Sequence, residues 1–331
     1  MRILVTGGAG FIGSTYVRRR LADDPEGSVR VLDKLTYAGR RENLEGLERC
    51  ELVVGDIADR DVVRQAIEGC DAVVNFAAET HVDRSITSPD EFVQTDVFGT
   101  FVLLEATHAA GVRHVQVSTD EVYGSIPEGS FTEASPIDPS SPYSAAKAGG
   151  DLMVTAFQRT YGADALIARG SNNFGPRQYP EKLIPLCILN ALAGDPLPVY
   201  GDGMQVRNWL WADDFAQATD LVLASGEAGQ IYNVGGPDEL PNIEVVKAIL
   251  ELTGRDESLI TYVADRPGHD RRYSLSSEKL RSDLGWAPDV RFRDGLERTV
   301  AWYRDNEAWW GPIRSGQYRA YYERQYGRAL G

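Results

Sequence analysis

The first half of the chain alternates short runs of β-branched and other apolar residues with longer stretches of helical periodicity. This alternation is typical of a parallel sheet whose strands are joined by crossover helices. We therefore expect an α/β fold built on a doubly wound parallel sheet. The expected strands are Ile3 to Thr6, Val29 to Asp33, Glu51 to Val54, Ala72 to Phe76, Val115 to Ser118 and Ala165 to Ala168. The expected helices cover residues 12–22, 59–68, 89–110 and 142–161.

Beyond about residue 170 the pattern becomes less regular, and prolines interrupt the loops. A helix at Asp213 to Ala224 and a strand at Ile231 to Val234 are expected to rejoin the main sheet, and the aromatic segment from Trp302 to Tyr326 is interpreted as a packed carboxy-terminal helix region. The remainder predicts a smaller C-terminal α/β lobe for a substrate. The predicted division is 1–170, with 204–234 rejoining it, for the first domain and 171–203 with 235–331 for the lobe.

Composition narrows the classes of partner. The chain has 331 residues and a net charge of −15, which is the wrong sign for gripping a phosphate backbone, so we expect no nucleic acid partner. Three separated cysteines and four scattered histidines lack the spacing of a zinc site, so we expect reduced thiols and no metal. No apolar run approaches the ~20 residues that span a bilayer, and the amino terminus shows no leader. We expect a soluble, cytoplasmic protein without a membrane partner.

A glycine-rich turn follows the first expected strand and opens the first expected helix, at Gly7, Gly10 and Gly13. Glycines at these positions allow a tight turn, close approach of a pyrophosphate and packing of the helix on the sheet. The free N–H groups and the dipole of the helix start attract negative charge. The motif predicts a Rossmann-type dinucleotide site, and its context makes a glycine turn without ligand the less favoured alternative.

Two acidic residues follow at strand ends. Asp33 stands 20 residues after Gly13, where a carboxylate accepts hydrogen bonds from ribose hydroxyls and repels a 2′-phosphate, so NAD is favoured over NADP. The neighbouring Lys34 softens that repulsion without removing it. Asp56 follows the third strand and is a candidate partner of the adenine amino group, with a turn or helix-capping role equally open.

Tyr143 and Lys147 are spaced i, i+4 on an expected helix, which places both side chains on one face. A lysine cation beside a phenol, together with a positively charged nicotinamide, lowers the pKa of the tyrosine, so we expect Tyr143 to take a proton from a hydroxyl. A tyrosine and a lysine at this spacing are common by chance on helices, where they are usually surface residues. Because the glycine motif and its strand precede them in this chain, a catalytic pair becomes the favoured interpretation.

Thr119, Asp120 and Glu121 follow the fifth expected strand. An oxidoreductase that uses a tyrosine and a lysine needs only one small hydroxyl group, such as that of Thr119, at this strand end. The two adjacent carboxylates are therefore more than hydride transfer alone requires. Beside a keto sugar, one acid can remove the proton α to the carbonyl while the other protonates a β leaving hydroxyl, which is a dehydration. A solvated turn after a strand is the alternative.

These residues resemble the extended short-chain dehydrogenase/reductase superfamily and, within it, the dTDP-glucose 4,6-dehydratase family. The resemblance covers essentially the whole chain. The blocks that carry it are TGGAGFIGS (6–14), DKLTYAG (33–39), GDI (55–57), FAAETHVDRSI (76–86), STDEVYGS (118–125), SPYSAAKAGGD (141–151), NNFGPRQYPEKLIPL (172–186), YGDG (200–203), VRNWL (206–210) and DRPGHDRRYS (265–274). Departures from the family's usual residues, Phe174 and Arg40, lie outside the proposed chemistry.

The resemblance implies a redox-neutral hydro-lyase reaction on a dTDP-glucose substrate. Tyr143 would deprotonate the 4-hydroxyl as hydride leaves C4 for NAD, Thr119 would bond the same oxygen, and Lys147 would hold the ribose and tune Tyr143. Glu121 would then remove the C5 proton while Asp120 protonates the departing 6-hydroxyl. Hydride would return to C6 and a proton to C5, giving dTDP-4-keto-6-deoxyglucose.

The resemblance also implies binding residues and an assembly. The implied cofactor contacts, with the glycine motif and the catalytic pair, are Gly7, Gly10, Phe11, Ile12, Gly13, Asp33, Lys34, Thr36, Asp56, Ile57, Ala77, Ala78, Thr95, Tyr143, Lys147 and Asn173. The implied substrate contacts are Thr80, Thr119, Asn172, Lys182, Leu183, Pro198, Tyr200, Arg207, Asn242, Arg266 and His269. His269 is interpreted as a hydrogen-bonding residue. Family members imply a homodimer joined through 89–110 and 142–161, whose apolar residues are equally compatible with a core role: Phe98, Phe101, Leu104, Leu152 and Phe157.

Two other functions stay open from the residues alone. A nucleotide-sugar 4-epimerase shares NAD, the tyrosine and the lysine but has no use for the pair Asp120 and Glu121. A catalytically silent NAD-binding regulator would keep the fold without the chemistry. The choice between thymine and uracil also stays open, because one methyl group contributes only ~1 to 3 kcal/mol in a pocket. The pathway that uses the product stays open as well, with cell-wall sugars and secondary metabolites as the two possibilities.

Overall fold

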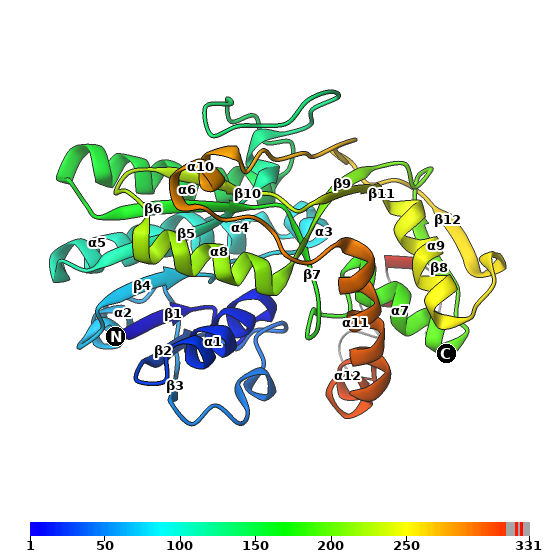
Figure 1. The fold of residues 1–331 in the computed structure, drawn as a ribbon, viewed down its shortest axis with the longest axis horizontal. Coiled ribbons are helices and arrows are strands. Elements are labelled where there is room, and N and C mark those ends of the chain that lie inside the picture. Colours follow the sequence, from blue (N-terminus) through cyan, green and yellow to red (C-terminus); the bar gives the residue numbers. More distant parts are fainter. Residues whose placement is uncertain (316–321, 324, 327–331) are drawn as a thin grey trace.

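A parallel sheet forms the centre of the molecule (Figure 1). The computed structural model describes residues 1–315, 322, 323, 325 and 326. Within these residues the main sheet has seven strands in the order β10-β6-β5-β4-β1-β2-β3, and every neighbouring pair is parallel. The strands are β1 (Arg2–Thr6), β2 (Ser28–Asp33), β3 (Cys50–Val54), β4 (Ala72–Asn75), β5 (Arg113–Thr119), β6 (Ala165–Gly170) and β10 (Ile231–Val234). This confirms the predicted α/β, doubly wound class.

Helices cover both faces of the main sheet. Helices α1 (Phe11–Asp23) and α8 (Ala212–Ser225) pack together on one face, and α2 (Arg60–Ile67), α5 (Thr100–Ala110) and α6 (Pro142–Tyr161) follow one another on the other. Alternate residues of a strand point to opposite faces. The buried side chains of β1 follow that rule, because Ile3 and Val5 join the core under α1 while Leu4 joins the core under α2 and α5. The run of apolar residues in this strand is therefore buried on both sides.

The segment predicted as one helix over 89–110 is helical throughout, which confirms the prediction. It begins as α4 (Pro89–Phe92), continues as a π-helical turn, η2 (Val93–Gly99), and becomes α5 at Thr100. The π-helical turn itself was not predicted, because apolar spacing does not reveal a turn with i to i+5 hydrogen bonds. The next helix, α6, begins and ends as expected, since Ser141 and Ser144 form a capping box and Gly162 closes its end.

A second group of elements lies beside the carboxyl ends of the main strands (Figure 1). It contains the sheet β11-β9-β7 and the pair β12-β8, covered by α7, α9 and α11 around an apolar core. Its elements are β7 (Asn172–Phe174), α7 (Leu183–Ala193), β8 (Leu197–Tyr200), β9 (Val206–Trp211), β11 (Asp238–Pro241), α9 (Asn242–Thr253), β12 (Ile260–Val263), α11 (Phe292–Asp305) and α12 (Glu307–Ser315). The remaining short helices are η1 (Arg41–Leu44), α3 (Val82–Thr87), η3 (Asp120–Tyr123), η4 (Glu257–Leu259) and α10 (Glu278–Leu284).

The segment 204–234 is shared between the two groups. Strand β9 pairs with β7 and β11, whereas α8 packs on α1 and β10 pairs with β6 in the main sheet. The division of the chain into two domains stays a prediction. Of the aromatic segment 302–326, residues 316–321 and 324 lie outside the described residues, and α12 covers part of the rest. Among the described helices, none combines the length and the apolar character needed to cross a membrane.

A buried ion pair ties α6 to the sheet. The Arg169 Nε of β6 donates to Asp151 Oδ2 at 2.8 Å, both side chains are 2% exposed or less, and the hydroxyl of Ser118 donates to the same carboxylate oxygen. Removing one partner of such a pair leaves the other charge buried and uncompensated.

We predict that Asp151→Asn lowers the free energy of unfolding by about 3 to 5 kcal/mol, because the guanidinium of Arg169 loses its counter-charge in the core. Urea unfolding followed by circular dichroism measures the change. The matched control is Glu251→Gln, which removes the exposed ion pair with Arg293 and should leave the midpoint nearly unchanged. Equal midpoints for Asp151→Asn and the wild type would contradict the prediction.

Candidate active site

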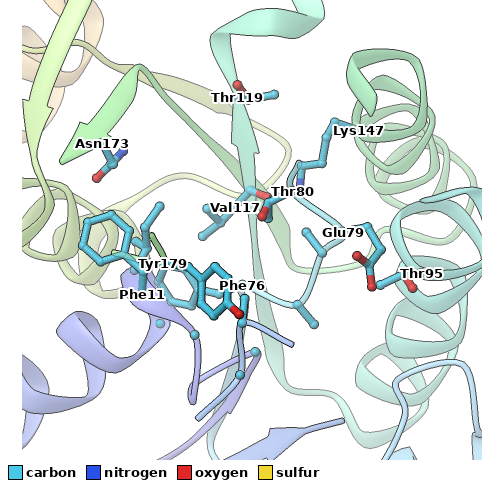
Figure 2. A pocket seen from close by; sticks show the side chains of 18 of the residues that line it. Phe11, Phe76, Glu79, Thr80, Thr95, Val117, Thr119, Lys147, Asn173 and Tyr179 are labelled. Carbon is cyan, nitrogen blue, oxygen red and sulfur yellow. The ribbon is translucent and has the colours of Figure 1, made fainter. Parts of the chain in front are cut away.

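A deep pocket opens at the carboxyl ends of β1, β2, β4 and β5. In the strand order, β1 and β4 are the neighbours from which the chain winds in opposite directions, which is where doubly wound sheets bind ligands. Figure 2 shows side chains from both groups of elements around it, with Lys147 reaching in from α6. The fold therefore brings the predicted cofactor and catalytic segments to one place.

The glycine turn packs closely against the chain's own backbone. A Cβ on Gly13 would lie 2.3 Å from the Gly7 carbonyl oxygen, and one on Gly7 would lie 2.5 Å from the Ala77 nitrogen. Gly7 also has a φ of +67°, which side chains disfavour. The turn thus delivers the start of α1 to the pocket with backbone N–H groups facing it, as a pyrophosphate site requires.

Asp33 ends β2 at the pocket wall and is held by the backbone. Its two carboxylate oxygens accept the N–H groups of Ala9 at 2.9 Å and Leu35 at 2.8 Å. Burial raises the pKa of Asp33, and these two hydrogen bonds act against that rise. The Lys34 ammonium lies 2.7 Å from Asp56 Oδ2, so its positive charge is paired with a second acid of the pocket rim. Asp56 also accepts the Ala58 N–H at 2.9 Å, so its turn role and its place in the pocket coexist.

Every residue predicted to contact the cofactor lines this pocket, although the contacts themselves stay a prediction. The pocket has the donor set that a dinucleotide needs: backbone amides for the pyrophosphate, the Asp33 carboxylate for a ribose, and apolar walls for the rings. The residues therefore fit NAD.

The proposed base lies at the inner end of the pocket. Tyr143 is 9% exposed and Lys147 is 5% exposed, and the Lys147 Nζ donates to the Val117 carbonyl oxygen at 2.9 Å. In the chain without ligand, burial and the charges of Glu121, Asp96 and Asp120 raise the pKa of Tyr143 well above its ordinary value. Burial is the largest cause of this rise, and the acids add to it. The predicted lowering of the Tyr143 pKa refers to the complex with a positively charged nicotinamide and stays a prediction.

Of the two carboxyl groups after β5, Asp120 is buried and Glu121 is half-buried. Thr119 caps the short helix η3 by accepting the Glu121 N–H at 3.2 Å, and its hydroxyl donates to Asp120 Oδ1 at 3.2 Å. Burial, and then the charge of Glu121, raise the pKa of Asp120 to about 8, while its Oδ2 has no hydrogen-bond partner. A solvated turn is thereby excluded, and Asp120 is the protonated member of the pair at neutral pH.

Three cations surround Glu121. Burial raises the pKa of this carboxyl group, and the charges of Arg266, Arg207 and Lys182 act in the opposite direction. Each cation is held in place, because the Lys182 Nζ donates to the Thr80 carbonyl at 2.6 Å, Arg266 lies 3.4 Å from Asp83, and Arg207 donates to the Asp270 carbonyl at 3.0 Å. Positive charge is thus gathered beside the acids, where a diphosphate would need it.

The predicted substrate residues divide into two sets. Thr80, Thr119, Asn172 and Lys182 line the pocket. The others do not line it and lie in the lobe next to it: Leu183, Pro198, Tyr200, Arg207, Asn242, Arg266 and His269.

Within the second set, the His269 ring lies edge-on to Tyr200 with centroids 6.2 Å apart. Burial and the charge of Arg266 lower the pKa of His269 to about 4. This ring is neutral at physiological pH, which suits the predicted hydrogen-bonding role.

Several lining residues were not singled out from the sequence. Glu79, Tyr179 and Glu181 enter the pocket from loops, and Phe215 enters from α8. The first three lie inside the matched blocks, which was the available signal, whereas nothing local marks Phe215. Gln325, far along the chain, donates to the Tyr200 hydroxyl at 2.7 Å and so brings the described carboxy-terminal residues to the lobe site.

The fold and the pocket define a dinucleotide-binding enzyme with a tyrosine and lysine pair and two extra acids. Residues 4–299 match the model of the GDP-mannose 4,6 dehydratase family, and the chain belongs to this family. A dTDP-glucose 4,6-dehydratase of Streptomyces niveus is 53% identical over 95% of this chain and 96% of its own length. One of Mycobacterium tuberculosis is 46% identical over 98% and 99%. These relatives confirm the resemblance predicted from the motifs.

Solved structures show the same likeness. A dTDP-glucose 4,6-dehydratase from Streptomyces venezuelae with NAD and TYD bound superposes with a TM-score of 0.93, at 54% identity over 95% of this chain and 100% of that one. A UDP-glucose 4-epimerase of Thermus thermophilus in complex with NAD gives a TM-score of 0.86 at 34% identity, over 92% and 100%. The fold alone is therefore shared with epimerases.

We predict that Asp33→Asn weakens the preference for NAD over NADP by about tenfold or more, because the carboxylate that repels a 2′-phosphate becomes neutral. Isothermal titration of both dinucleotides against the wild type and the variant measures the ratio. Asp61→Asn, on the exposed start of α2, is the control and should leave the ratio unchanged. An unchanged ratio in Asp33→Asn would rule out the assigned ribose contact.

Proposed function

We propose that the chain catalyses the dTDP-glucose 4,6-dehydratase reaction, the NAD-dependent conversion of dTDP-glucose to dTDP-4-keto-6-deoxyglucose and water. The observation that carries this function is that buried Asp120 and half-buried Glu121 line the pocket with Tyr143, because a dehydration needs an acid and a base in addition to the group that deprotonates O4. Curated dehydratases at 53%, 49% and 46% identity over nearly the full chain support the same reaction and the same class, hydro-lyase.

NAD is the cofactor, and bound in the glycine-turn pocket it supplies the hydride chemistry, acceptance at C4 and return at C6. The chain's own residues do the rest. Tyr143 takes the proton of the 4-hydroxyl, and the Thr119 hydroxyl orients that oxygen. Lys147, anchored on Val117, provides the positive charge that offsets the surrounding carboxylates when the phenol ionises.

Elimination follows from the two acids. The 4-carbonyl acidifies the C5–H bond, Glu121 takes that proton, and Asp120 donates its proton to the 6-hydroxyl, which departs as water. Glu121 later returns its proton to C5. At the end of the cycle Tyr143 has gained one proton and Asp120 has lost one, and exchange with solvent returns both groups to their starting states. The net change is the loss of one water molecule.

A 4-epimerase is the nearest alternative, since epimerases share the fold. Epimerisation at C4 leaves C5 and C6 unchanged, so it needs no acid such as Asp120, whose pKa is raised to about 8. The test is incubation of the purified chain with dTDP-glucose and no added NAD, followed by mass spectrometry and NMR. Loss of 18 mass units with a new methyl doublet is expected; an isomer of unchanged mass would establish the epimerase, and no turnover with NAD still bound would establish the regulator. The expected mass loss, ~18 Da, is that of the water molecule expelled in the dehydration.

The same assay with dUDP-type and dTDP-type glucose nucleotides addresses the base preference, because the solved neighbour carries TYD while its epimerase counterpart is named for UDP-glucose. We propose thymidine as the preferred nucleoside. Cytoplasmic location stays a prediction.

We predict that Asp120→Asn still oxidises C4 but eliminates water about 10²- to 10⁴-fold more slowly, because the leaving hydroxyl loses its acid. Rapid-quench single turnovers should then show keto-glucose and reduced cofactor accumulating. Tyr143→Phe is the control and should form neither. Elimination at the wild-type rate in Asp120→Asn would remove this residue from the mechanism.

The raised pKa of Asp120 predicts a pH dependence of the elimination step. Burial holds the carboxyl group protonated up to about pH 8, and only the protonated form can donate, so the rate of elimination should fall as pH rises through about 8. Stopped-flow measurement of cofactor reoxidation between pH 6 and pH 9.5 gives the profile. A rate that is flat, or that rises across this window, would contradict the assigned acid.

We propose a homodimer joined through the helices α5 and α6. Of the apolar residues predicted there, Leu104 and Phe157 are buried in the chain's own core, Phe98 and Phe101 are half-buried, and Leu152 is 57% exposed. Val93 of η2 and Tyr161 of α6 are further exposed apolar residues of the two predicted segments, at 55% and 58%. An apolar surface of this kind is typical of a protein interface.

We predict that Leu152→Arg shifts the chain from dimer to monomer, because it places a charge in the centre of that surface. Light scattering after size exclusion measures the mass. Tyr262→Arg, which is 58% exposed on β12 and far from α6 in the fold, is the control and should stay dimeric. A dimeric Leu152→Arg, or a monomeric wild type, would overturn this interface.

A further inference from the structure

Asp96 is a buried acid to which no role has yet been given. It lies on the π-helical turn η2, is 1% exposed, and belongs to neither the predicted catalytic nor the predicted binding residues. Short π-helical turns are rare and recur at functional sites. A charged side chain without solvent needs a partner, because burial alone would favour its neutral form.

Two glycines of α6 let η2 approach closely enough to present this acid. A Cβ on Gly150 would lie 2.6 Å from the Asp96 carbonyl oxygen, and one on Gly149 would lie 2.8 Å from Val97 Cγ2. Glycine inside a helix costs roughly 1 kcal/mol relative to alanine. The chain accepts that cost twice in succession at the turn of α6 that faces Asp96.

The partner of Asp96 is Lys147. Its Nζ lies 3.7 Å from Asp96 Oδ1, which has no hydrogen bond, while Oδ2 accepts the Glu79 N–H at 3.3 Å. The same Nζ donates to the Val117 carbonyl at 2.9 Å. Lys147 therefore stands between a backbone carbonyl of β5 on one side and a carboxylate of η2 on the other.

We propose that Asp96 is a positioning residue for the base: its carboxylate holds the Lys147 ammonium in place and competes with the Tyr143 oxygen for that positive charge. This inference rests on the proposed function, in which Lys147 supports Tyr143. The Asp96 carboxylate thus restrains the ionisation of Tyr143, and its protonation releases Lys147 to act on the phenol alone.

The charges around the pair fit this role. Burial raises the pKa of Asp96 to about 7, Lys147 acts against that rise, and the Glu79 carboxylate in the loop after β4 adds to it. From α6, Tyr143 faces the same space, and the charge of Asp96 is one of three that raise the pKa of this phenol, together with Glu121 and Asp120 of η3.

The first test needs neither substrate nor cofactor. The ¹³Cγ resonance of Asp96 in aspartate-labelled chain, assigned by its loss in Asp96→Asn, is titrated in the wild type and in Lys147→Met. With the cation gone, the midpoint of Asp96 should rise by about one pH unit or more from near 7. A midpoint unchanged by Lys147→Met overturns the pairing.

The second test measures the base. Asp96→Asn keeps the shape of the side chain and removes its charge, so Tyr143 should ionise more easily. In the pH profile of the rate of C4 oxidation, the acidic limb should therefore move to lower pH by about half a unit or more. Asp96→Ala should move it in the same direction, which covers the case in which the asparagine variant folds poorly. Asp214→Asn is the control: Asp214 is also a buried carboxylate, it accepts the N–H groups of Asp289 and Val290, and it should leave the limb where it is.

The two failures are distinguishable. A wild-type chain that makes no keto sugar contradicts the proposed function and leaves the ¹³C titration to decide the pairing. The role of Asp96 is overturned if the wild type is active and the acidic limb of its pH profile is unchanged in Asp96→Asn or Asp96→Ala. Circular dichroism and melting temperature establish that the variant compared is folded.

Discussion

The chemistry of this chain depends on grouping acids with little access to water at one edge of a sheet. Asp96 and Asp120 are buried and Glu121 is half-buried near Tyr143, and the Lys147 ammonium lies 3.7 Å from Asp96. In a medium of low dielectric each charge is felt strongly by its neighbours, so protonation states separate. One acid is kept protonated, a second is kept ionisable by nearby cations, and the phenol gives up its proton only with help. These are the states that an elimination between two hydride transfers requires.

The fold brings these groups together because the loops and helices that carry them meet at the carboxyl ends of the parallel strands. The end of β5 and the helix η3 carry Thr119 and both acids, α6 carries Tyr143 and Lys147, and η2 carries Asp96. The lobe contributes the arginines that face Glu121. The main sheet fixes these elements against each other, and ties such as Arg169 with Asp151 hold α6 in register with β6.

Much of this arrangement was predictable from local pattern. Strands buried on both faces are near-continuous apolar runs, and the glycine turn with Asp33 at the next strand end has a fixed geometry, so the sheet and the dinucleotide pocket followed from the sequence. The spacing of Tyr143 and Lys147 on one helix face was equally local.

Tertiary placement was not predictable in the same way. The π-helical turn η2 leaves the apolar spacing of 89–110 intact, so Asp96 gave no sign that it would meet Lys147. A lysine four residues from Tyr143 is visible in the sequence, whereas the acids of η2 and η3 that add to the rise of the Tyr143 pKa come from other elements and are not. The lobe residues Tyr200 and His269 depend on distant segments in the same way.

The central claim is that one bound cofactor removes a hydrogen from C4 of the sugar and returns the same hydrogen to C6 after water has left. Incubation with dTDP-glucose deuterated at C4, without added oxidant or reductant, tests it directly by NMR and mass spectrometry of the product. We predict deuterium in the new methyl group. A methyl group without the label, or turnover that requires stoichiometric external oxidant, would contradict the account.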